Sequence, residues 1–175
     1  MVNLTLDDLL VYTDWERQKW RDFVESRGAD LLKFKAGEHG DGRFQTIGDI
    51  VRHIFSAEKR YVERLSGRPL TDSAAVPSDN IDALFDFGQL SRKELRECIV
   101  GFPADHWDVL QELKFGNSTI TATPKKIVIH IVLHEVRHWA QIATLFRQNG
   151  IPGDFHDFLF SPVLGGEVRR EQAKV

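Results

Sequence analysis

The stretch KKIVIHIVLHEVRHWAQIATLFRQNG, residues 125–150, decides how the rest of the chain is interpreted. It is a long apolar segment that carries His130, His134 and His138 at a spacing of four residues. Thr123 and Pro124 before it are typical of an N-cap and a first helical residue, and a glycine at its end is typical of a left-handed stop. The pattern predicts one helix of about 25 residues, or about 37 Å.

The histidine spacing predicts how many of the three can share a metal ion. Histidines four residues apart lie about 6 Å apart along a helix and can turn their imidazoles onto one ion. His130 and His138 lie about 12 Å apart, too far to share an ion whose bonds to nitrogen are about 2.1 Å long. One adjacent pair, either His130 with His134 or His134 with His138, is therefore predicted to act with a residue from another element. The competing interpretation is that all three are hydrogen-bonded, partly buried helix residues.

The second pair also spells HEVRH, residues 134–138, which matches the HExxH string of zinc proteases, where the glutamate is the general base. Glu135 is one residue, about 100°, away from His134 on the helix. We expect it on the outer side of the helix between two neighbours of a bundle, so the protease interpretation is not favoured.

Composition limits the class of protein. With 175 residues, 42% of them hydrophobic, the chain is predicted to form one domain, residues 1–175, with a full-sized core. The formal net charge of −3 argues against a nucleic-acid partner. No stretch is apolar enough to span a membrane, and the N-terminus lacks the pattern of a signal peptide, so a cytoplasmic protein is expected. Cys98, the single cysteine, is expected to be a buried structural thiol.

Three further helices and a hairpin are predicted upstream of the histidine helix. The helices span residues 5–27, 46–66 and about 80–100, and the last of these contains Gly88. Residues 107–121 carry two short β-forming runs around Gly116 and Asn117, which is typical of a hairpin. We expect the inward faces of the first and third helices to carry Leu6, Leu9, Leu10, Thr13, Trp20, Phe23 and Val24, and Leu84, Phe87, Leu90, Leu95, Cys98 and Ile99. The chain is therefore predicted to be all-α, a four-helix bundle with a small β-hairpin before the last helix.

His53 is the candidate partner on another element. It lies on the flank of the apolar stripe of the second helix, although a histidine there can also simply bond a carbonyl or an acid. The connector of residues 68–79 is long enough to cross an end of the bundle, which favours an up-down-down-up order. In that order the second and last helices are antiparallel, and His53 lies level with His134 and His138. Parallel helices would place it nearer His130.

The chain resembles the DinB family, the DinB and YfiT-like metalloenzymes, over nearly its whole length. The resemblance rests on the segments YTDW (residues 12–15), TIGDIVRH (residues 46–53) followed by Glu58, and HEVRHWAQ (residues 134–141), with Ala140 where relatives often carry Gly. In that family the histidine of the second helix and the two of the last helix bind one divalent ion. The resemblance thus implies His53, His134 and His138 as the metal ligands, with His130 outside the ligand set.

Three neutral imidazoles leave a divalent ion, zinc or nickel, with its positive charge and an open position, which is typical of catalytic sites. Such an ion favours deprotonated water or thiolate. The expected activity is therefore either that of a hydrolase or that of a transferase that uses an external low-molecular-weight thiol. The family includes mycothiol- and bacillithiol-dependent enzymes, so the resemblance implies a metal but neither a substrate nor a catalytic residue. The alternative is a non-catalytic metal-binding or stress-response module. Aromatic residues such as Trp107 and the FHDFLF segment, residues 155–160, together with the resemblance predict a homodimer.

Overall fold

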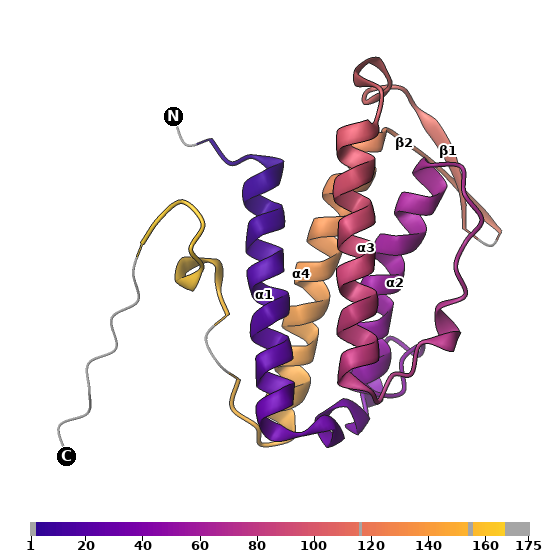
Figure 1. The fold of residues 1–175 in the computed structure, drawn as a ribbon. Helices are drawn as coiled ribbons and strands as arrows, with labels where there is room; N and C mark the ends of the chain where they lie inside the picture. The colour runs from indigo at the N-terminus through magenta and orange to yellow at the C-terminus, as the bar shows by residue number, and fades with distance from the viewer. Residues whose placement is uncertain (1–2, 116, 154–155, 167–175) are drawn as a thin grey trace.

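The computed structural model of the chain describes residues 3–115, 117–153 and 156–166. Four long helices make up the body of this part: α1 (Leu6–Arg27), α2 (Ile47–Leu65), α3 (Ile81–Gly101) and α4 (Pro124–Gln148). An antiparallel hairpin of β1 (Gln111–Phe115) and β2 (Ser118–Ala122) directly precedes α4 (Figure 1). The predicted fold class, a helical bundle with a hairpin before the last helix, is confirmed, and Gly116 of the predicted turn lies outside the described residues.

The ends of α2 and α4 are fixed by the caps that the sequence predicts. The hydroxyl of Thr46 accepts a hydrogen bond from the amide of Asp49, and the Asp49 carboxylate accepts one from the amide of Thr46. At α4 the Thr123 hydroxyl accepts a hydrogen bond from the amide of Lys126, without a returning bond, and Pro124 is the first helical residue. After α4, Gly150 has φ 74°, the left-handed conformation expected at a helix stop. These local signals set where the histidines lie along both helices.

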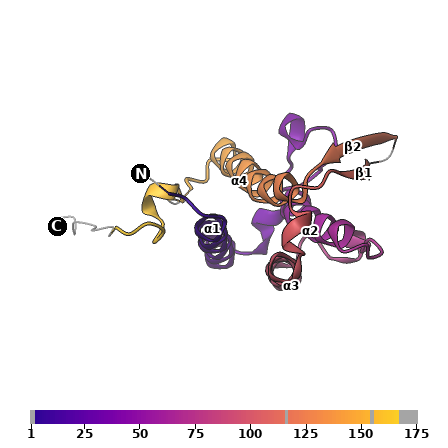
Figure 2. The ribbon, with the colours of Figure 1, turned by 90° about the horizontal axis from the view of Figure 1, so that it is seen from above.

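Contacts between side chains give the directions of the helices. The ring of His53 lies 5.0 Å from that of His138, and the ring of Tyr61 lies 5.2 Å from that of His130, so α2 and α4 are antiparallel. The contacts of Trp20 with Trp139 and of Phe23 with Phe146 show that α1 is parallel to α4. Phe55 contacts Phe85, and Ser66 further along contacts Cys98, so α2 is parallel to α3. The order is therefore up-down-down-up, as predicted. Seen along the bundle, α4 lies between α1 and α2, which it contacts on either side (Figure 2).

Two apolar clusters fill the bundle, and a layer of charged residues separates them. One cluster includes Trp20, Phe55 and Trp139, and the other includes Leu10 and Val132. Along each helix, the buried charged or hydroxyl residues of this layer lie between residues of one cluster and residues of the other. The layer consists of Thr13, Arg17, Glu58, Ser91, Arg92 and Glu135. Within the described residues, no helix is both long enough and apolar enough to cross a bilayer.

Some predicted faces are wrong. Leu90, expected inward, is 48% exposed, and Cys98 is only half-buried. Arg17 is buried on α1 although only apolar residues and Thr13 were expected there, and Glu135, expected on the outer side of α4, is only 2% exposed. Both charges are buried because they pair with one another across the bundle. Gly88 lies inside α3, where the ring of Phe55 packs against its backbone. A Cβ at this position would meet that ring at 2.9 Å, so only glycine allows Phe55 to pack this closely.

Candidate metal centre

Three imidazoles from two helices converge at one point of the bundle. The Nε2 atoms of His53 on α2 and His134 on α4 are 3.1 Å apart, and those of His134 and His138 are also 3.1 Å apart. Ligand atoms of all three residues lie within 4.8 Å of one another. Among the described residues, this is the group of histidine, cysteine or acidic side chains whose positions suit a metal ion.

The separation of the nitrogen atoms fits a transition-metal ion. Two nitrogens bound to one ion at about 2.1 Å lie about 3.0 Å apart at a right angle and about 3.4 Å apart at the tetrahedral angle. The observed 3.1 Å falls within this interval. Imidazole nitrogen is a preferred ligand of both zinc and nickel. The donor set therefore matches the implied ion in chemistry, and the two distances from His134 match it in spacing.

Gln141 fixes the orientation and tautomer of His138. Its side-chain amide donates to the backbone carbonyl of His39, which turns the amide oxygen toward His138, 2.7 Å from Nδ1. An amide oxygen only accepts hydrogen bonds, so Nδ1 of His138 carries the hydrogen. Nε2 then presents its lone pair to the other two histidines. Metal-binding histidines commonly have such a support on the second ring nitrogen.

The three rings are uncharged at neutral pH. Burial, followed by the neighbouring His138, lowers the pKa of His53 to about 4, and the same two causes lower the pKa of His134 to about 3. Arg43 and Arg60 also lower the pKa of His53. Burial lowers the pKa of His138, which is 1% exposed. Uncharged imidazoles retain the lone pairs that a cation requires.

His130 lies outside this group. Its ring is 5.5 Å from that of His134 and packs against Tyr61, and the residue is exposed. It lines an apolar groove of about 890 Å³ together with Trp107 and Leu133. The structure thus brings His53 to the pair His134 and His138, whereas helical spacing alone left both pairs open.

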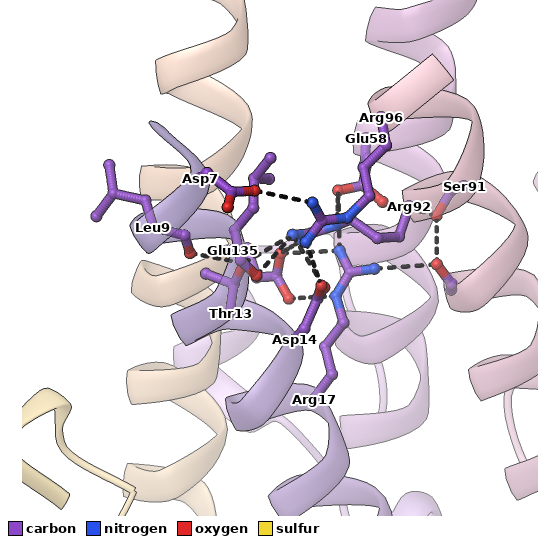
Figure 3. Close-up of polar contacts among 12 residues, drawn as sticks. Asp7, Leu9, Thr13, Asp14, Arg17, Glu58, Ser91, Arg92, Arg96 and Glu135 are labelled. Carbon is purple, nitrogen blue, oxygen red and sulfur yellow. Dashed lines mark hydrogen bonds and ion pairs between the residues drawn. The ribbon is translucent and has the colours of Figure 1, made fainter. Parts of the chain in front are cut away.

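Glu135 lies apart from the three histidines, in the charged layer (Figure 3). Arg17 donates to its two carboxylate oxygens at 2.5 and 2.8 Å, Arg92 donates to it at 2.7 Å, and the indole of Trp139 donates at 3.1 Å. Burial alone would raise the pKa of Glu135, but Arg17 and Arg92 hold the pKa below its ordinary value. A carboxylate bound in this way is not positioned as the general base of a zinc protease.

Glu58 completes the charged layer. It accepts from Arg17 at 3.0 Å, from Arg92 at 3.1 Å and from the hydroxyl of Ser91 at 3.0 Å. Two arginines therefore face two glutamates, and the buried charges balance. In the sequence, Glu58 stands out only through the family resemblance, because no local pattern indicates which distant charge it meets.

Comparison with known proteins identifies the family. A model of the DinB family matches residues 1–162 of the chain, and so the chain belongs to the DinB family. No curated protein matches the chain.

Proposed function

We propose that this DinB-family chain binds one divalent ion, zinc or nickel, through His53, His134 and His138. We further propose that it uses the ion for hydrolysis or for the transfer of an external low-molecular-weight thiol. The observation that supports the proposal is the convergence of three uncharged imidazoles, with the Nε2 atom of His134 3.1 Å from those of both His53 and His138. When bound, a divalent ion would supply the Lewis acidity that favours deprotonated water or thiol near neutral pH.

The residues around the site support a reactive rather than a closed centre. Among the described residues, no carboxylate joins the three imidazoles, so a bound ion would keep its positive charge. Gln141 holds His138 in place, which limits the motion of one ligand. Burial raises the pKa of the Cys98 thiol, which lies beside Ser66 on another part of the bundle. A thiol reactant would therefore come from outside the chain.

Elemental analysis of the purified protein tests the metal site. We expect about one zinc or nickel ion per chain, and loss of most of it in His53→Ala. His106→Gln serves as a control because His106 is an exposed histidine outside the group. Full occupancy in His53→Ala would overturn the ligand assignment.

A reaction screen separates the two chemistries. Metal-loaded and metal-free protein are compared in thiol-conjugation assays with several low-molecular-weight thiols and in ester and amide hydrolysis assays. Turnover that requires both the metal and a thiol supports the transferase, and turnover without a thiol supports the hydrolase. A stoichiometric metal with no turnover in either screen would favour the non-catalytic module.

We also propose that the chain forms a homodimer through exposed apolar surface. Leu133 beside the apolar groove is 59% exposed, Leu110 before the hairpin is 66% exposed, and Leu159 in the C-terminal segment is 84% exposed. The groove lined by Trp107, Ile129 and Leu133 is an exposed apolar patch, a feature typical of interfaces. Light scattering at micromolar concentration should give twice the chain mass, and a monomer mass would contradict the proposal.

A further inference from the structure

A second, polar pocket adjoins the histidine site. It has a volume of about 480 Å³ and is lined by Arg43 and Phe44 before α2, by His53, Ser56 and Arg60 along α2, and by neighbouring polar residues that include Arg52. His53 therefore belongs both to the three-histidine group and to the wall of this pocket. A molecule filling the pocket would lie next to the site proposed for the metal.

The pocket carries an excess of positive charge. Arg52 is neutralised, since it donates to Asp49 at 2.9 Å and to the carbonyl of Val76 at 3.0 Å. Arg43 pairs with the exposed Asp41 at 3.6 Å, and its guanidinium lies 5.0 Å from the centre of the Phe44 ring. Among the described residues, no ion pair joins Arg60 to a carboxylate. Three arginines and one aspartate line the pocket, so its net charge is positive, and Arg60 has no acidic partner in this part of the chain.

The sequence spacing places Arg60 and His53 on one face of α2, because they are seven residues apart. Ser56 lies between them along the helix, and all three residues line the pocket.

We propose that this pocket binds the oxyanion, a carboxylate or a phosphate, of a small substrate whose reacting group lies at the three-histidine site. The inference rests on the proposed function. Guanidinium groups match oxyanions in charge and hydrogen-bonding geometry, and a pocket of this volume suits a small molecule. Arg60 and Arg43 act as binding residues, and the histidines remain the metal ligands.

Calorimetric titration of metal-free protein tests the pocket without competition from a bound ion. The probes are inorganic phosphate and succinate, titrated in the millimolar range at constant ionic strength. We expect saturable binding and an increase of about tenfold or more in Kd for Arg60→Gln and Arg43→Gln, because a charge-assisted hydrogen bond is lost. Arg64→Gln is the matched control, since Arg64 lies one turn further along α2 with its guanidinium 4.6 Å from the centre of the Phe115 ring.

The outcomes separate the pocket from the metal site. Binding of one probe alone identifies that oxyanion as the ligand class and supports the proposal. Absence of saturable binding to both probes, or an equal loss in Arg64→Gln, overturns it. Elemental analysis of the same wild-type protein reports on the metal independently, so the proposed function and the oxyanion pocket can fail separately.

Discussion

Neighbouring residues of α4 belong to two polar regions, one in which the polar groups are paired with one another and one in which they converge as acceptors. Glu135 is buried in the charged layer and accepts hydrogen bonds from two arginines and a tryptophan. His134 and His138 lie on a different face of the same turns, and the Nε2 atom of His134 is 3.1 Å from those of both His138 and His53. Two arginines balance two glutamates in the first region, whereas in the second three nitrogen acceptors converge on one point. This difference distinguishes polar residues that hold the bundle together from polar residues placed for a ligand.

The largest effect should follow from Glu135→Ala. The change leaves Arg17 and Arg92 buried with Glu58 as their remaining central partner, and breaking a buried ion pair costs about 3–5 kcal/mol of unfolding free energy. Urea denaturation of the metal-free protein measures the loss. His134→Ala is the control at the neighbouring position of α4, and we expect it to cost less than about 2 kcal/mol. Equal losses in the two variants would remove the distinction between the regions.

Gln141→Leu should weaken metal binding by about 10- to 100-fold, because His138 loses the acceptor that orients its ring. Competition with a chromogenic chelator measures the affinity. Gln148→Leu is the matched control, since Gln148 also lies on α4 and contacts His39 but not His138. An equal loss in both variants would show that Gln141 does not act through His138.

The two regions should also differ in how the unfolding free energy depends on pH. This effect is smaller than the preceding ones, since His53 and His134 are only partly buried. Their pKa values in the folded metal-free protein, about 4 and about 3, lie below the ordinary 6.5. Between pH 6.5 and 4 the unfolded chain therefore binds protons that the folded chain does not, and the unfolding free energy falls as the pH falls. Glu135, whose pKa is lowered from 4.5, loses its contribution only at lower pH. Denaturation at pH 7, 6 and 5 should show the decline, reduced in His53→Gln. A flat profile would contradict the pKa shifts.

His130→Gln should have the smallest effect. Because His130 is exposed and lies outside the three-histidine group, metal content should stay near wild type and stability should change by less than about 0.5 kcal/mol. Elemental analysis and thermal unfolding check both quantities. Loss of the metal in this variant would favour the pairing of His130 with His134 that helical spacing alone permits.

The parts of the fold that depend on local chemistry could be predicted from the sequence. Thr46 and Thr123 cap helices through residues three positions away, and both helix starts follow from those signals. The level of His53 relative to α4 follows from helix lengths and the antiparallel order. The burial of Glu135 could not be predicted, because its partner Arg17 is 118 positions away and no single-sequence pattern pairs distant charges. The support of Gln141 by His39 was also not predicted, since a backbone carbonyl has no sequence signature.

The charged layer has a consequence for the order in which the bundle forms. Its contacts join residues 33 to 118 positions apart on all four helices, so the layer closes only when every helix has docked. Contacts between distant segments require large loops to close first, which slows their formation. Interactions that form after the transition state act on the unfolding rate more than on the folding rate. The layer would therefore slow the unfolding of the native bundle and lengthen its lifetime, without accelerating its folding.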